Sequence, residues 1–313
     1  MRNYNKTKIF FILIALIMII TSCSGNPKPQ EEKDNSNSPP ELPKVYTEIE
    51  EEILKTMFSI DGIAGIEKAL EEKEKAKEEV AEESEVDLKP EEKEKPAKEE
   101  IDVKMLVKME AVVIPLLEEE DIESEIVMVD EVPGDINKVW YQINQLVNTL
   151  HTKWNSLEPH LQKAGVDPKK IQEFEGNLDS TTVFVNEKDT HQSMIALNHL
   201  LSNLYDFGGS FKTKIPSEVM KIKNHIREIV LMADAEDYPG ALSNFEEAKR
   251  LGEALKQRLI EKDATDVLQK FELSMEDLNK ELQKENFNLI QIKGGIVLKN
   301  TVAMKEAFEG ESK

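Results

Sequence analysis

Apolar residues separated by three or four positions recur through the last 180 residues of this 313-residue chain, and no other feature constrains its fold as strongly. This spacing aligns the apolar side chains along one face of an α-helix, and that face must be buried against another surface. The pattern is clearest over residues 136–161, 194–204 and 219–233. It predicts an all-α fold for residues 134–313.

Residues that start and stop helices divide this region. Asp135 is placed to cap a first helix that ends at Gly165. A second helix ends at Gly208 and Gly209. Pro216 opens a third helix, because proline is favoured in the first helical turn.

The third predicted helix is interrupted by the stretch DAEDYPG, residues 234–240, and then continues to about Glu261. A fourth helix covers residues 267–289, with the following Gly294–Gly295 pair as its end or as a hinge, and a short helix lies at 303–308. Long helices joined by short loops are typical of an antiparallel four-helix bundle. We therefore predict such a bundle for residues 134–313.

A strongly acidic region, residues 49–133, precedes the bundle and is predicted to be a stalk with short helical segments. Its most charged part, residues 67–100, has fifteen acidic and eight basic side chains. One interpretation is a charged single helix or a coiled-coil rod. Few apolar residues are available for a coiled-coil repeat, and Pro90 and Pro96 would interrupt the helix. We favour a solvated, largely disordered spacer with transient helix in its first half.

Two parts of the acidic region are less charged. Residues 45–66 have an amphipathic pattern that predicts a short helix docked on another element. Residues 101–132 combine β-branched residues with a helix-like surface pattern, so their periodicity leaves both helix and strand open. We expect a helix followed by an irregular segment that covers part of the bundle.

The N-terminal residues have the organisation of an export signal. Arg2, Lys6 and Lys8 precede twelve apolar residues, 9–20, and small residues follow. A helix of that length spans about 18 Å, which is shorter than the roughly 30 Å hydrocarbon core of a bilayer. Residues 1–22 are therefore predicted to be a cleaved signal peptide rather than a membrane span.

The single cysteine of the chain follows this segment directly. The sequence Ile20-Thr21-Ser22-Cys23 resembles the lipobox of bacterial membrane lipoproteins. The resemblance implies that the thiol of Cys23 receives a diacylglyceryl group, that the chain is cut before Cys23, and that the new amine is a further site for acylation. It also implies a lipid-anchored position at the extracytoplasmic face of the cell membrane.

The physical chemistry agrees with a lipidated cysteine. A lone cysteine in an exported chain has no partner for an internal disulfide. Two acyl chains give stable membrane anchoring, whereas one gives only marginal binding. Residues 23–48 are polar and rich in proline, as is typical of a flexible linker between an anchor and a folded domain.

The distribution of charge limits the partners. Residues 1–133 have a net charge of −17 and residues 134–313 a net charge of −5, out of −22 for the chain. Binding of nucleic acid needs a basic surface, so we expect no nucleic-acid partner. The sequence has no phosphate-loop, dinucleotide or Gly-x-Ser-x-Gly motif, so we predict neither an enzyme nor a cofactor.

The function predicted from these features is a membrane-anchored, non-catalytic interaction module that binds a protein or a component of the cell wall. The alternative is a carrier that binds a ligand or a metal in the bundle core. Its candidate ligands are His151, His191 and His199 with Glu187, since a helical bundle can build a metal site from facing glutamate and histidine side chains. No Glu-x-x-His motif occurs at these histidines, and a surface position in the first turn of a helix is the simpler explanation for His191.

Overall fold

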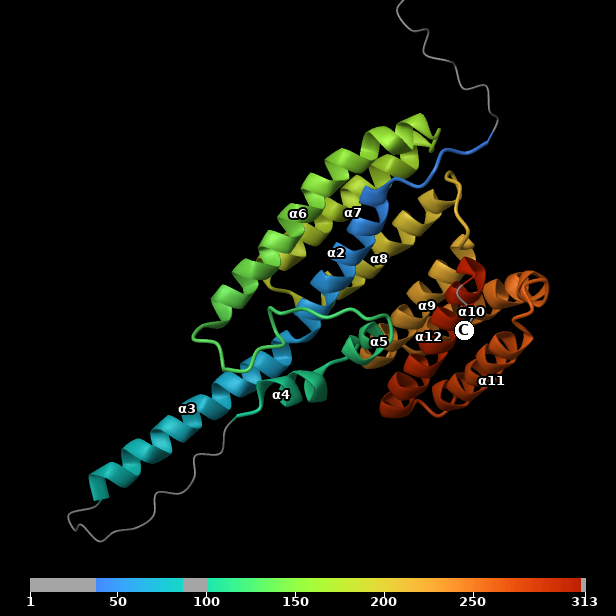
Figure 1. Cartoon of the computed structure of the whole chain (residues 1–313). Helices are drawn as coiled ribbons and strands as arrows, with labels where there is room; N and C mark the ends of the chain where they lie inside the picture. Colours follow the sequence, from blue (N-terminus) through green and yellow to red (C-terminus); the bar gives the residue numbers. More distant parts are fainter. Residues whose placement is uncertain (1–37, 87–100, 311–313) are drawn as a thin grey trace, which may run out of the picture. The chain divides into compact units, whose positions relative to one another are not determined.

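Most of the chain that the structure describes is helical. A computed structural model describes residues 38–86 and 101–310. From Pro39 onward these residues belong to one compact unit, Pro39–Lys313. The signal peptide, Cys23, the linker up to residue 37 and residues 87–100 lie outside the described residues. The helices labelled in Figure 1 are α2 (Lys44–Asp61), α3 (Ile63–Val86), α4 (Val103–Glu110), α5 (Ile114–Glu118), α6 (Ile136–Lys163), α7 (Pro168–Glu187), α8 (Thr190–Gly208), α9 (Ser217–Asp234), α10 (Tyr238–Ile260), α11 (Thr265–Leu282) and α12 (Phe287–Glu309).

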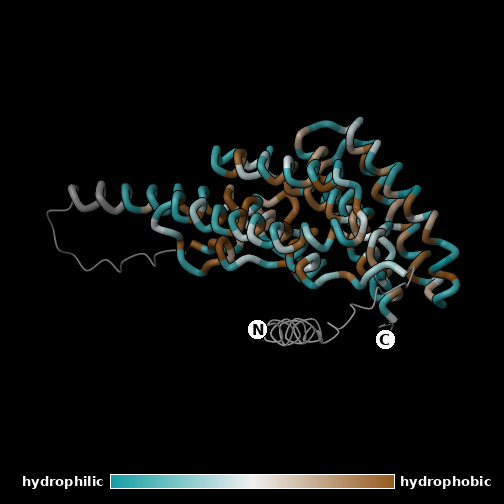
Figure 2. Tube along the Cα trace, turned by 90° about the horizontal axis from the view of Figure 1, so that it is seen from above, coloured by the Kyte–Doolittle hydropathy of each residue, from teal (hydrophilic) through white to brown (hydrophobic). Residues whose placement is uncertain are grey.

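The predicted all-α fold is confirmed, because these described residues contain no β-strand. None of their helices is both long enough and apolar enough to cross a membrane. Figure 2 shows the hydrophobic residues concentrated between the helices, where their side chains form one continuous core.

Four-helix packing is present twice. Helices α2, α6, α7 and α8 form a first four-helix group, and helices α9 to α12 form a second (Figure 1). The contact between α8 and α9 joins the two groups. Loops of two to four residues join successive helices from α6 to α8 and from α9 to α12. Such short loops make consecutive helices antiparallel.

Helix α2 is an integral part of the first group. It packs on α6 and α8, and the side chains of Ile49, Ile53 and Phe58 are almost completely buried. The hydroxyl of Tyr46 donates a hydrogen bond to the carbonyl of Leu204 at 2.8 Å. The expectation of a docked helix in residues 45–66 is therefore confirmed, and the core begins well before residue 134, where we had predicted the bundle to start.

Helix α3 begins in the core and then leaves it. Ile63, Ile66 and Ala69 are buried, whereas the side chains from Glu74 to Glu78 are exposed. Figure 2 shows these outer turns as hydrophilic. The side chains are solvated, as predicted, but the helix continues without interruption to Val86.

Helices α4 and α5 cover the core, in agreement with the expectation for residues 101–132. A Cβ atom on Gly65 of α3 would lie 2.3 Å from the Cα of Val107, so the backbones of α3 and α4 are in direct contact. The Asp61 carboxylate accepts hydrogen bonds of 2.7 to 3.0 Å from the amides of residues 112–114, which lead into α5. The side chain of Gln291 in α12 donates to the carbonyls of residues 111 and 112. This segment therefore links both groups.

Several helix boundaries differ from those predicted. Helix α7 was not predicted at all, and the stretch 234–240 reverses the chain between two antiparallel helices instead of interrupting one. The Gly294–Gly295 pair lies inside α12, and the true break is at Asn286, whose side chain accepts from the Leu289 amide.

The reversals explain these differences. Each of the five short loops has one residue with φ between 53° and 75°, the left-handed region that glycine adopts most readily. Only one of the five is a glycine; the residues are Gly165, Lys188, Glu236, Asp263 and Glu285. Glycine position in the sequence therefore identified one loop of the five.

Candidate functional site

The structure gives no information on the predicted lipidation site, because Cys23 lies outside the described residues. The other candidates are all described. His151 in α6 is half-buried, and its Nε2 lies 2.8 Å from the hydroxyl of Thr182 in α7. This hydrogen bond joins two neighbouring helices and involves no carboxylate.

The remaining candidates lie on the surface. Glu187 is the last residue of α7, His191 is in the first turn of α8, and both are exposed. His199 is also exposed, with its Nε2 3.8 Å from a carboxylate oxygen of Glu228. Within the described ranges, no three histidine, cysteine, aspartate or glutamate side chains come close enough to hold a metal ion. The four candidate ligands are thus not brought together.

An aromatic cluster occupies the core of the first group. The ring centroids of Trp154 and Phe174 are 4.2 Å apart in a stacked arrangement, and Phe207 packs beside both. All three rings are buried. Trp154 is therefore a residue of the hydrophobic core.

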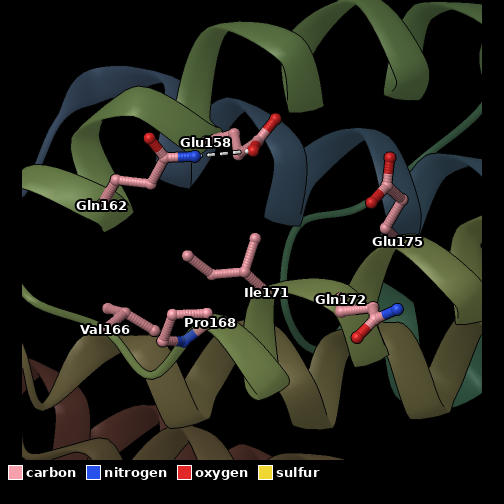
Figure 3. Close-up of a pocket in the computed structure, with 7 residues that line it drawn as sticks. All are labelled: Glu158, Gln162, Val166, Pro168, Ile171, Gln172 and Glu175. Atoms are coloured by element: carbon pink, nitrogen blue, oxygen red, sulfur yellow. Dashed lines mark hydrogen bonds between the residues drawn. The ribbon is translucent and has the colours of Figure 1, made fainter.

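An open hollow of about 430 Å³ lies where α6 ends and α7 begins. Figure 3 shows Ile171 between the side chains of Glu158 and Gln162 on one side and Pro168 on the other. The Gln162 amide donates to the Glu158 carboxylate at 2.8 Å. Ligand sites of this volume usually enclose most of the ligand, whereas this hollow is open to solvent.

The most unusual arrangement in the described residues is a cluster of buried charges between the two groups. The Glu120 carboxylate, directly after the α5 region, contacts the ammonium of Lys223 and the guanidinium of Arg227, both from α9. Their side chains are 3%, 5% and 0% exposed. We call these three residues the buried charge cluster.

Polar side chains of the first group surround the Arg227 guanidinium of this cluster. The Tyr205 hydroxyl of α8 donates to the Glu50 carboxylate of α2 at 2.9 Å and lies 3.5 Å from a guanidinium nitrogen of Arg227. The Asn198 amide donates to Glu228 at 2.5 Å, and its oxygen lies 3.4 Å from the Nε of Arg227. Helices α2, α8 and α9 are thus joined through Arg227.

The electrostatics of the cluster favour the ionised form of Glu120. Burial disfavours the Glu120 carboxylate, but Lys223 and Arg227 outweigh this effect and lower the pKa of Glu120 below its ordinary value. Burial raises the pKa of the Tyr205 phenol well above its ordinary value, so this hydroxyl remains a donor. The cluster joins its helices through ion pairs and hydrogen bonds, so it can fix their relative positions.

Sequence reasoning missed this cluster, because Glu120, Lys223 and Arg227 resemble ordinary surface charges. One signal was present. Helix α9 has apolar residues around most of its circumference, which is typical of a helix buried on all sides. Charged residues on such a helix must be paired, so Lys223 and Arg227 required buried partners.

Exposed apolar residues are concentrated on the second group. Of the nine large apolar side chains that are exposed among the described residues, four belong to α11 and α12. Leu273 is 62% exposed, Ile292 56%, Ile296 41% and Leu289 37%. We call these four residues the α11–α12 surface.

Comparison of the chain with protein-family models, with curated proteins and with solved structures found no match.

Proposed function

We propose that this chain is a lipid-anchored protein of the bacterial cell envelope and that its helical unit binds a protein partner without catalysis. The observation that supports the binding role is the α11–α12 surface. Scattered exposed apolar residues are normal, but a group of them on adjacent helices is typical of an interaction site. The proposed anchor rests on the N-terminal signal and on the lipobox-like sequence that ends at Cys23.

The linker is long enough to serve such a module. Residues 24–38 supply up to about 50 Å of extended chain, so a unit that begins at Pro39 could bind partners at or well away from the membrane. The metal-carrier alternative gains no support from the positions of His151, His191 and His199 among the described residues.

The anchor is tested by the substitution Cys23→Ala in the bacterial cell. We expect the wild-type mature chain to begin at Cys23, to carry acyl groups detectable by mass spectrometry, and to partition into detergent. The variant should remain unprocessed by the lipoprotein peptidase. Normal cleavage of Cys23→Ala, or a mature chain without acyl groups, would rule out the anchor.

The binding role is tested by photo-crosslinking in the intact envelope. A photoreactive amino acid replaces Ile292 in one strain and Val183, an exposed aliphatic residue of α7, in a control strain. We expect a discrete adduct of defined mass from position 292 and none from position 183. If position 292 gives no adduct, or if both positions give the same adducts, the surface does not bind a partner.

A further inference from the structure

We propose that Met105 and Met109 of α4 form a site that reacts with peroxides, and that the protein keeps its fold when both are oxidised. The inference does not depend on the proposed lipid anchor or on the α11–α12 surface. It rests on three features of the described residues: the exposure of these two thioethers, the contacts that hold α4 in place, and the burial of the other methionines.

The two thioethers lie on the outer face of α4, one turn apart. Met105 is 52% exposed and Met109 is 64% exposed. Side chains four residues apart are neighbours on the surface of a helix, so both sulfur atoms share one face. The solvated face of a helix usually has polar residues, whereas this face presents two unbranched apolar side chains. A small oxidant in solution therefore reaches two neighbouring sulfur atoms.

Other residues of α4 hold the helix in place. Val107 is completely buried against α3, where it is in direct contact with the backbone at Gly65. The ammonium group of Lys108 pairs with the Glu118 carboxylate of α5 at 2.6 Å. Figure 1 shows α4 beside α3 in this arrangement. The attachment of α4 therefore does not depend on the two exposed thioethers.

The other methionines among the described residues are shielded by the fold. Some belong to the core, with at most 4% exposure, and the rest are partly buried against it. The core methionines are Met57, Met194, Met275 and Met304, and the partly buried ones are Met128, Met220 and Met232. Oxidation of a sulfur atom requires that the oxidant can reach it. The pair on α4 is therefore oxidised first.

The reaction is an oxygen transfer from peroxide to sulfur. A lone pair of the methionine sulfur attacks one oxygen of hydrogen peroxide, so that an S–O bond forms and the O–O bond breaks. The second oxygen leaves as hydroxide and takes the proton of the new S–OH group, which gives methionine sulfoxide and water. The sulfur loses two electrons and the peroxide gains two. Each thioether of α4 thus consumes one molecule of peroxide.

The effect of a sulfoxide on the fold depends on where it forms. A new oxygen on Met57 or Met304 would enter the apolar core, where both side chains are completely buried. A polar group buried without a hydrogen-bond partner destabilises the folded state. The oxygen on Met105 or Met109 instead lies at the surface, where water can donate hydrogen bonds to it. The most reactive methionines are thus those whose oxidation disturbs the fold least.

Hydrogen peroxide treatment of the full mature chain with Cys23→Ser, which has no thiol, tests the proposal. Peptide mass spectrometry should detect sulfoxide at Met105 and Met109 at least tenfold faster than at Met57 or Met304. After the uptake of two oxygen atoms, the melting temperature should remain within about 2 °C of its original value. Equal rates at exposed and buried methionines would overturn the proposal, and so would loss of the folding transition at this stage.

Two variants and a denaturant control locate the reactive site. The double variant Met105→Leu/Met109→Leu keeps an apolar surface without sulfur, so it should lose the rapid uptake of oxygen. The matched control Met220→Leu removes a partly buried methionine of α9 and should keep it. In denaturant, Met57 should react as fast as Met105, because no fold shields it. Rapid uptake in the double variant, its loss in Met220→Leu, or slow oxidation of Met57 in denaturant would contradict the proposal.

Discussion

The two four-helix groups are assembled from the sequence in different ways. The second group is continuous, since α9 to α12 follow one another with loops of three or four residues. The first group takes three consecutive helices, α6 to α8, and adds α2, which ends 74 residues before α6 begins. Local sequence patterns can therefore specify the second group, whereas the first depends on a long-range contact across the acidic region.

The junction between the groups also differs from their interiors. The interior of each group is apolar, with rings such as Trp154 and Phe174 in the first and Phe271 in the second. The junction contains the buried charge cluster, together with the three hydrogen bonds that Asp61 accepts. Buried polar groups are costly unless all are paired, so such a junction favours one relative arrangement of the helices over many others.

The largest loss of stability is expected from removing α2. A fragment of residues 134–313 lacks the buried side chains of α2, each of which contributes about 1.5–3 kcal/mol. Their sum approaches the total stability of about 5–15 kcal/mol for a folded domain. We expect α6 to α8 to lose their cooperative unfolding transition, measured by circular dichroism, while fragment 39–313 retains it. Similar melting of the two fragments would show that α2 is dispensable.

The second-largest loss of stability is expected from the variant Arg227→Met. The variant leaves the buried Glu120 carboxylate with one of its two cationic partners, and removing one member of a buried ion pair costs about 3–5 kcal/mol. Chemical denaturation measures the loss. The matched control is Arg250→Met, whose exposed ion pair with Glu247 is screened by solvent and should contribute little to stability. Equal losses in the two variants would mean that the cluster does not stabilise the junction.

The pH dependence of the free energy of unfolding should reveal the raised pKa of the Asp61 carboxyl. Burial raises the pKa of the Asp61 carboxyl from 3.8 to about 6, despite the three amide hydrogen bonds that favour the carboxylate. The folded chain then binds this proton more tightly than the unfolded chain. The contribution of Asp61 to the free energy of unfolding therefore falls as the pH rises from about 4 to about 6, by at most about 3 kcal/mol.

The variant Asp61→Asn isolates this contribution. Asparagine keeps one acceptor oxygen and does not titrate, so the variant should lack the decrease between pH 4 and 6. Glu120 has the opposite sign, since its pKa is lowered and its contribution is lost as the pH falls below about 4.5. Both the wild type and Asp61→Asn contain Glu120, so its contribution to the pH dependence cancels when the two profiles are compared. Parallel pH profiles of the two proteins would contradict a raised pKa for Asp61.

The smallest effect concerns one loop of the second group. Glu285 has a φ of 53°, so Glu285→Gly should raise the free energy of unfolding by up to about 1 kcal/mol. The control is Gln283→Gly, two residues earlier, where φ is −67° and glycine has no advantage. A stabilisation in the control but not in Glu285→Gly would contradict the left-handed conformation.

The sequence predicted the helical class and several helix starts, because these depend on local spacing and capping. Asp135 caps α6 as predicted, through a hydrogen bond from the Asn137 amide. The amphipathic pattern around Ile49 was also recognised. Its partners were not, since a stripe of apolar residues shows that a surface is buried without showing what buries it.

The remaining features depend on tertiary structure. Helix α7 contains Gly176 and the β-branched run from Thr181 to Val183, which have low helix propensity, and packing between α6 and α8 compensates for this. The charges of Glu120 and Lys223 are far apart in the sequence and meet only in the folded chain. The candidate ligands His191 and His199 share one helix, but no element places a third ligand beside them in the described residues.

Amide hydrogen exchange of the intact chain tests most directly whether α2 belongs to the first four-helix group. The amides of residues 49–60 in α2 should exchange as slowly as those of residues 143–157 in α6, because one cooperative core protects both. The side chains from Glu74 to Glu78 in α3 are exposed, and the amides of this part of the helix should exchange much faster. If α2 exchanges at the rate of that part of α3 while α6 remains protected, the acidic region does not contribute to the folded core.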